Sequence, residues 1–165
     1  MVKIGLLSDT HGDLDPKIFH YFKDVDEIWH AGDIGTVEVI DQLRAFKPLR
    51  AVYGNIDGYE VRMETPLHNR FRVEKVDVLM THIAGKPGKY AKPAYEELQK
   101  GAPKLFVCGH SHILLVKFDP QFNMLWMNPG ACGNKGFHQV KTLLRFRITD
   151  DRIHDLEVIE LEKRV

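Results

Sequence analysis

Short apolar runs that alternate with segments of helical periodicity are the feature that most constrains the fold. The runs cover Val2–Leu7, Glu27–Ala31, Leu49–Val52, Val76–Thr81 and Leu105–Cys108. Each is rich in Val, Ile, Leu or aromatic residues, as buried strands are. The segments between them that have helical character are Lys17–Phe22, Val37–Phe46 and Tyr90–Lys100. Alternation of strands and helices predicts an α/β protein with a mostly parallel sheet.

The C-terminal part follows a different pattern, in which apolar runs are separated only by turns. These runs cover Leu114–Phe118, Met124–Met127, Leu143–Ile148 and Ile153–Leu161. The connections between them are rich in Asp, Asn, Pro and Thr, which favour turns. We therefore predict a second, largely antiparallel sheet packed on the first. Because no segment resembles a linker, we expect residues 1–165 to form a single domain.

Polar residues that can bind metal ions stand directly after the apolar runs of the first part. The candidate ligands are Asp9, His11, Asp33, Asn55, His82, His110 and His112. In open α/β sheets, ligands bind at the carboxyl ends of the strands. The sequence therefore predicts that carboxylates, imidazoles and an amide gather at one edge of the molecule.

The number and kind of these side chains favour a centre with two divalent ions. One ion does not need seven mixed nitrogen and oxygen donors, whereas two ions do if one carboxylate bridges them. Aspartate with imidazole suits Mn, Fe, Ni, Zn or Co better than Mg or Ca. Two divalent ions, Asp9, Asp33 and a hydroxide leave a charge of about +1, which matches a phosphodiester monoanion.

Each residue also has a structural interpretation when it is taken alone. Asp33 could be a helix N-cap, and Asn55 could be a turn residue. His30 could orient a ligand or fill a polar gap in the core. Asp57 could hold a ligand in place or cap a turn. The joint occurrence of polar groups after five runs favours the metal site over five independent structural explanations.

Other classes of protein fit less well. The sequence contains no P-loop, dinucleotide-binding fingerprint or nucleophile elbow. Cys108 and Cys132 do not have the spacing of a structural zinc site. We expect both cysteines to be reduced and to lie in the core. Zero net charge indicates no broad basic surface for nucleic acid. Since neither a signal peptide nor a membrane span is evident, we expect a soluble cytoplasmic protein.

The motifs together resemble those of the calcineurin-like metallophosphoesterase superfamily. The resemblance rests on Asp9-Thr10-His11, Gly32-Asp33, Gly54-Asn55, His82 and Gly109-His110-Ser111-His112, in this order. The chain length and Asn128-Pro129-Gly130 are similar to the small bacterial and archaeal branch of phosphodiesterases, the YfcE-like group.

The resemblance implies a fold, a ligand assignment and a reaction. The fold is a four-layer α/β/β/α sandwich of two mixed sheets flanked by helices. One metal ion is held by Asp9, His11, Asp33 and His112. The other ion is held by Asp33, Asn55, His82 and His110, so that Asp33 bridges. Water or hydroxide activated by both ions attacks a small phosphodiester in line. Asp33, Asn55 and His82 are the residues expected to act in catalysis.

Departures from the family pattern refine the expected activity. Many members carry a histidine directly after the asparagine, as a candidate general acid, whereas this chain has Ile56. We therefore expect the best rates with good leaving groups. Lys86 and Lys89, which follow His82 in a loop with Gly and Pro, could contact phosphate or simply be solvated.

Two alternatives share the predicted scaffold. A nuclease would need a basic groove or an added DNA-binding domain, and the zero net charge and short chain argue against both. A protein-interaction scaffold of the retromer-subunit type would use the same fold to bind partners. All ligand positions are filled here, which favours catalysis, and the chain could also form a homo-oligomer.

Overall fold

The computed structural model describes residues 1–163, so the last two residues of the predicted 1–165 domain lie outside the described part. The helices of the described part are α1 Lys17–Tyr21, α2 Val37–Phe46, α3 Tyr59–Glu64 and α4 Lys92–Lys100. None of these helices has the length and apolar character that crossing a lipid bilayer requires.

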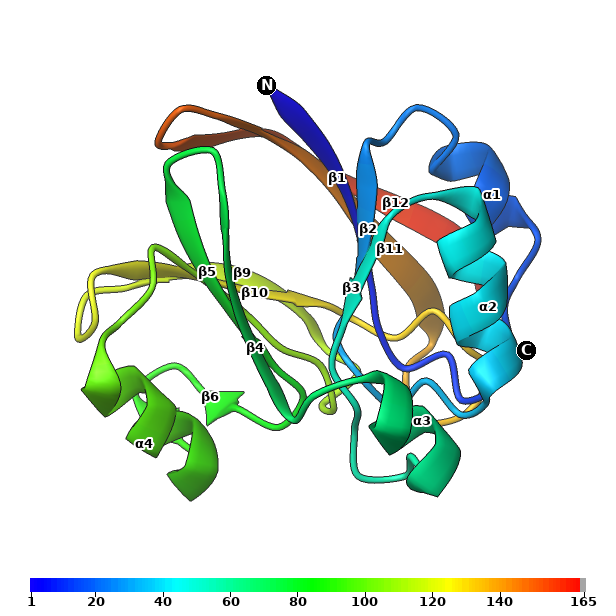
Figure 1. Cartoon of the computed structure of the whole chain (residues 1–165), viewed down its shortest axis with the longest axis horizontal. Coiled ribbons are helices and arrows are strands. Elements are labelled where there is room, and N and C mark those ends of the chain that lie inside the picture. Colours follow the sequence, from blue (N-terminus) through cyan, green and yellow to red (C-terminus); the bar gives the residue numbers. More distant parts are fainter. Residues whose placement is uncertain (164–165) are drawn as a thin grey trace.

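The strands form two five-stranded sheets and a small hairpin (Figure 1). Sheet A has the order β12-β11-β1-β2-β3, and its strands are β12 Arg152–Lys163, β11 Val140–Thr149, β1 Val2–Leu7, β2 Glu27–His30 and β3 Leu49–Ala51. Sheet B has the order β4-β5-β8-β10-β9, and its strands are β4 His68–Val73, β5 Val76–Thr81, β8 Leu105–Val107, β10 Met124–Pro129 and β9 Leu114–Asp119. The hairpin pairs β6 Gly85–Lys86 with β7 Lys89–Tyr90.

Three apolar clusters show that the sheets and helices stack in four layers. The cluster between the sheets contains Ile4 and Leu6 of β1 together with Val78 and Met80 of β5. Successive side chains of a strand point to opposite faces, so Leu7 faces the other way. It joins residues of α1 and α2 in the cluster outside sheet A. The third cluster places α4 against the outer face of sheet B, which completes the α/β/β/α order seen in Figure 1.

The four-layer sandwich of two mixed sheets is confirmed, but the predicted division of strands between the sheets is wrong. The C-terminal runs do not form a sheet of their own. Strands β9 and β10 join β5 and β8 in sheet B, and β11 and β12 join β1 in sheet A. Each sheet therefore combines strands from the early and the late part of the chain. In sheet A, for example, β1 is parallel to β2 and antiparallel to β11. Apolar runs indicate burial but do not specify which strand lies alongside.

Several elements were not predicted because they bury few side chains. Helix α3 buries only Val61, and strand β4 has a polar sequence in which only Val73 is fully buried. Strand β4 lies at the edge of sheet B, where one side of a strand has no neighbour and polar residues are tolerated. The helix predicted over Tyr90–Lys100 begins two residues later, since Tyr90 belongs to the hairpin.

Phe146 tests the packing between the two sheets. Its ring is buried and lies 5.5 Å from the ring of Trp29, which in turn contacts Phe71 of β4. We predict that Phe146→Ala lowers the free energy of unfolding by about 3–5 kcal/mol, because it leaves a cavity between the sheets. Phe118→Ala, at an exposed position of β9, should change it by less than about 0.5 kcal/mol. Equal effects in urea denaturation would contradict this account of the core.

Candidate metal centre

The clustered candidate ligands follow strands that lie in the middle of both sheets. Asp9 and His11 follow β1, Asp33 follows β2, His82 follows β5, and His110 and His112 follow β8. Strands β1 and β2 are parallel neighbours in sheet A, and β5 and β8 are parallel neighbours in sheet B. The carboxyl ends of all these strands therefore meet where the sheets face each other, as the sequence predicts.

These residues form two groups, each with the donors to bind one metal ion. The first group is Asp9, His11 and His112, and the second is Asp33, His82 and His110. Within each group the ligand atoms lie within 4.8 Å of one another. The structure thus divides the histidine pair of the loop after β8 between two groups.

Asp33 lies between the groups. Its Oδ2 atom is 3.5 Å from Nε2 of His11 in the first group and 3.2 Å from Nε2 of His82 in the second. One carboxylate oxygen is therefore close to imidazole nitrogens of both groups, which is the position that a bridging ligand requires.

The loop after β3 packs against Asp33 through its backbone. The Ile56 N–H donates to Asp33 Oδ1 at 3.1 Å. A Cβ atom at Gly54 would lie 2.1 Å from the same oxygen, so the close approach needs glycine at that position. Asn55 is exposed beside this contact, and its role as a ligand stays a prediction.

The charges of the buried ligands depend on one another. Burial disfavours the Asp9 carboxylate, but its contacts with His11 and His112 outweigh burial and lower the pKa of Asp9 well below its usual range. Burial also opposes ionisation of Asp33, and His82 outweighs it, so that the pKa of Asp33 is lowered. The pKa of His82 is raised, since the two carboxylates outweigh its own burial. The ionised carboxylates of Asp9 and Asp33 are thus stabilised by nearby positive charge, which a protonated imidazole or a metal ion can supply.

The imidazoles fit a bound cation. The Nε2 atoms of His11 and His82 are buried and have no hydrogen-bond partner within residues 1–163. His82 Nδ1 lies 2.7 Å from the Ala31 carbonyl oxygen, which can only accept, so Nδ1 carries the proton. When His82 is neutral, its Nε2 lone pair is then free to bind a metal ion. A cation at this position would satisfy atoms that are otherwise buried without a partner.

The loops hold most of these ligands in an unusual backbone conformation. Asp9, His11, Asp33, His110 and His112 have φ values between 49° and 72°, in the left-handed region. Such conformations cost about 1–3 kcal/mol each and cluster at functional sites. Backbone bonds hold them in place: His11 N–H donates to the Asp33 carbonyl at 2.9 Å, and Asp9 N–H donates to the Gly32 carbonyl at 3.0 Å.

His30 and Asp57 contact the loops rather than the ligand side chains. His30 Nδ1 accepts from the Gly32 N–H at 3.1 Å, so Nε2 carries the proton and donates to Thr10 Oγ1 at 3.0 Å. Burial lowers the pKa of His30 to about 4, which keeps it neutral. The Asp57 carboxylate accepts N–H bonds from Ile34, Gly35 and Gly54, which ties the loop after β2 to the loop after β3. Both residues can position ligands through the backbone.

His138 contacts the candidate ligand His112, which sequence analysis did not predict. His112 Nδ1 lies 3.2 Å from His138 Nδ1, and His138 Nε2 lies 2.8 Å from the Gly133 carbonyl oxygen. The carbonyl requires a proton on His138 Nε2, so His138 Nδ1 accepts from His112 Nδ1–H. In a neutral His112 the lone pair is then on Nε2, which faces Asp9 Oδ1 at 3.1 Å, an arrangement that a cation between the two atoms would favour. Nothing in the pattern around residue 138 indicates this role, because the contact spans 26 residues.

Two further residues make contacts at the site that sequence analysis did not predict. Ser8 Oγ donates to Asp9 Oδ2 at 2.6 Å. The Asn128 amide, at the end of β10, donates to the Gly109 carbonyl and to Ser111 Oγ, both at 3.0 Å. Asn128 therefore supports the loop that carries the last two histidines. The segment Asn128-Pro129-Gly130 was noted in the sequence only as a family resemblance.

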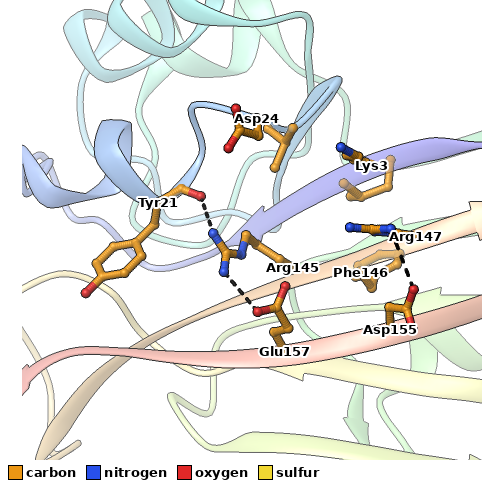
Figure 2. A pocket seen from close by; sticks show the side chains of 10 residues that line it. Lys3, Tyr21, Asp24, Arg145, Phe146, Arg147, Asp155 and Glu157 are labelled. Carbon is orange, nitrogen blue, oxygen red and sulfur yellow. Dashed lines mark hydrogen bonds and ion pairs between the residues drawn. The ribbon is translucent and has the colours of Figure 1, made fainter.

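A separate cavity of about 220 Å³ contains none of the candidate ligands. It lies between β1, β11, β12 and the end of α1, and Figure 2 shows its charged residues. Arg145 donates to the Tyr21 carbonyl and to Glu157, and Arg147 pairs with Asp155 (Figure 2). Both arginines thus bind acceptors in the wall of the cavity. Because none of the candidate ligands lines it, the cavity is not part of the metal centre.

The chain belongs to the calcineurin-like phosphoesterase superfamily, whose domain model matches residues 2–151. A probable metallophosphoesterase from Methanothermobacter thermautotrophicus is 31% identical over 134 residues, which is 78% of this chain and 76% of that protein. A probable metallophosphoesterase from Methanocaldococcus jannaschii is 29% identical over 133 residues, covering 78% and 67%. Membership of this family supports metal-dependent hydrolysis of phosphoric esters.

Solved structures with this fold include an enzyme and a sorting protein. A structure described as a novel archaeal phosphodiesterase superposes with a TM-score of 0.78 at 22% identity, covering 96% of this chain and 99% of that one. Vps29 from Chaetomium thermophilum superposes with a TM-score of 0.74 at 15% identity, covering 99% and 100%. At these identities the likeness concerns the fold.

The contact between His112 and His138 leads to a prediction about metal affinity. If His112 binds an ion through Nε2, His138→Phe should weaken binding at the first group by about 10–100-fold, because His112 loses the acceptor that orients its ring. His20→Phe, at an exposed position of α1, is the matched control and should bind metal like the unchanged protein. Calorimetric titration of metal-free protein with Mn²⁺ measures both. Unchanged affinity in a folded His138→Phe variant would show that His138 does not position His112.

Proposed function

We propose that this protein is a phosphodiesterase that works with two divalent metal ions. One ion would be held by Asp9, His11, Asp33 and His112. The other would be held by Asp33, Asn55, His82 and His110, with Asp33 shared. Candidate ions are Mn, Ni, Fe, Zn and Co, because the donors combine carboxylates with imidazoles.

The observation that carries the proposal is the pair of groups with Asp33 between them. Its Oδ2 atom lies within 3.5 Å of buried, unpartnered imidazole nitrogens on both sides. Residues that only supported the fold would not need two buried Nε2 atoms without hydrogen-bond partners. The second observation is that five of these residues adopt left-handed conformations, a cost that a shared function would explain.

The chain's own residues hold the reacting groups in place. Two ions close together would supply an activated water molecule and neutralise charge on the phosphate and on the leaving oxygen. The loops after β1, β2, β5 and β8 fix the ligands so that little reorganisation is needed when substrate binds. Similarity to the archaeal phosphodiesterase supports a diester as substrate.

The free thiols Cys108 and Cys132 are consistent with the proposed cytoplasmic location.

Ile56 would limit the range of substrates. Ile56 is 46% exposed and its backbone N–H contacts Asp33, so the residue lies near the centre and not in the core. Ile56 cannot donate a proton to a leaving alkoxide. We therefore propose that the enzyme prefers diesters with leaving groups of low basicity.

Similarity to Vps29 supports the protein-interaction alternative only through the fold. The alternative and the proposal differ in one respect that is easily measured. An enzyme turns over a diester when metal is restored, whereas an interaction scaffold does not.

Turnover of bis(4-nitrophenyl) phosphate by metal-stripped protein, with each ion added back, tests the proposal. We predict activity with at least one of Mn, Ni, Fe, Zn and Co. Asp33→Asn should lower kcat/KM by roughly 10³-fold, or about 4 kcal/mol, because one change weakens the hold on both ions. Asp41→Asn, an exposed carboxylate of α2, is the matched control. Failure of all five ions, or near-normal turnover by Asp33→Asn at saturating metal, would overturn the proposal.

A leaving-group series tests the role of residue 56. We predict that rates fall steeply as the pKa of the leaving alcohol rises, and that Ile56→His makes the slope shallower. A positioned general acid is worth about 10²–10⁴-fold, and poor leaving groups gain most. Ile56→Gln, which is polar but not acidic, is the control. Equal slopes in folded, metal-loaded Ile56→His and unchanged enzyme would show that residue 56 takes no part in proton transfer.

A further inference from the structure

A largely apolar pocket of about 560 Å³ is lined partly by residues that lie close in sequence to the candidate ligands His82 and His112. This volume falls within the roughly 300–1,000 Å³ that is typical of small-molecule sites. Its walls include Lys86, Lys89, Tyr90, Ser111, Ile113 and Trp126. The pocket therefore combines residues of the β6–β7 hairpin, which lies next to α4 in Figure 1, with residues of the loop after β8.

Both walls are continuations of loops that carry candidate metal ligands. The hairpin wall begins at Gly85, three residues after His82. On the other wall, Ser111 and Ile113 flank His112. Ser111 Oγ accepts hydrogen bonds from Asn128 and from the Ile113 N–H, which fixes this part of the wall. An ester substituent is joined to phosphorus through a single oxygen atom, so a substituent of a diester bound at these loops would lie close to the pocket.

The wall contains an unsatisfied donor as well as apolar surface. Trp126 is 2% exposed, and its indole Nε1–H has no hydrogen-bond partner within residues 1–163. A buried donor without a partner is unfavourable, and because Trp126 lines the pocket, an acceptor on a ligand that reached this N–H would satisfy it. Ile113, which is 65% exposed, adds apolar surface to the pocket. Both features fit a flat apolar group that bears hydrogen-bond acceptors.

The rim of the pocket carries positive charge. Lys86 and Lys89 are exposed, and neither forms an ion pair with any residue of the described part of the chain. Two unpaired ammonium groups beside an apolar cavity favour a ligand that is aromatic and also anionic. An anionic group would lose its hydration against the apolar wall, so the anionic part of a ligand would lie at the rim. The aromatic ring of the ligand would lie inside the pocket.

We propose that this pocket binds an aromatic ester substituent of the phosphodiester substrate, with Lys86 and Lys89 contacting anionic groups at its rim. The inference rests on the proposed function and specifies the substrate class. The pocket would then select substrates by the group attached to phosphorus, while the metal centre carries out hydrolysis.

Two diesters that release the same 4-nitrophenolate test this selection. Bis(4-nitrophenyl) phosphate keeps an aromatic substituent, and methyl 4-nitrophenyl phosphate does not. The variants are Ile113→Ser, which removes apolar wall, and Ala91→Phe, which fills the pocket from the start of α4. We predict that each lowers the ratio of kcat/KM for the aromatic over the methyl diester by about tenfold. Leu156→Ser, an exposed apolar residue of β12, should leave the ratio unchanged.

Fluorescence of Trp126 tests binding without turnover. The chain has two tryptophans, so Trp29→Phe leaves Trp126 as the reporter. Titration of this metal-free variant with phenyl phosphate should change its emission in a saturable way, whereas inorganic phosphate should not. Replacing Lys86 and Lys89 together by Ala should weaken phenyl phosphate binding several-fold.

The outcomes separate this inference from the proposed function. If both diesters are hydrolysed but neither pocket variant changes the ratio, the pocket does not select the substituent, and the phosphodiesterase proposal stands. If no metal ion supports hydrolysis of either diester, the phosphodiesterase proposal fails. The fluorescence titration then decides alone, and equal responses to phenyl phosphate and inorganic phosphate would overturn the pocket as an aromatic site.

Discussion

The carboxylate of Asp9 joins the two sheets at the proposed centre, and the rest of the site depends on this contact. Asp9 follows β1 of sheet A, and its Oδ2 accepts from Ser8 Oγ and from the backbone N–H of His110 in the loop after β8 of sheet B. Its Oδ1 lies 3.1 Å from Nε2 of His112 in the same loop. Asp33 makes the corresponding approach to His82. Two buried carboxylates therefore connect loops whose strands belong to different sheets.

This arrangement costs free energy in the absence of a cation. Two carboxylates lie close together in a buried region, and the charge of Asp9 opposes ionisation of Asp33. Left-handed conformations at five ligand positions add to the cost. The two carboxylates raise the pKa of His82, so a proton on its imidazole is held more tightly in the metal-free protein. A metal ion would replace that proton, so binding should release protons and stabilise the folded protein.

The sequence predicted the fold class and the convergence of the ligands because both follow from strand ends. An apolar run indicates a buried strand, and a polar block directly after it indicates a residue at the edge of the sheet. The sequence did not predict how strands divide between sheets, because Met124–Met127 and Leu143–Ile148 have similar patterns and lie in different sheets. His138 was missed because its role arises from a contact between loops that are distant in sequence.

Resemblance supplied what spacing could not. His110 and His112 are two residues apart, yet the structure places them in different groups. Both residues have a left-handed backbone, with φ values of 72° and 62°. No periodicity in the sequence specifies such a turn, although Asp and His adopt the left-handed conformation more readily than most residues other than glycine.

The number of metal ions bound by one chain tests the central claim most directly. Crystals of protein saturated with Mn²⁺, grown without chelator, allow the ions to be located by anomalous scattering. The proposed centre predicts two peaks, one beside Asp9, His11 and His112 and one beside His82 and His110, with Asp33 in bonding distance of both. A single peak, or none, in metal-saturated protein would contradict the two-metal centre.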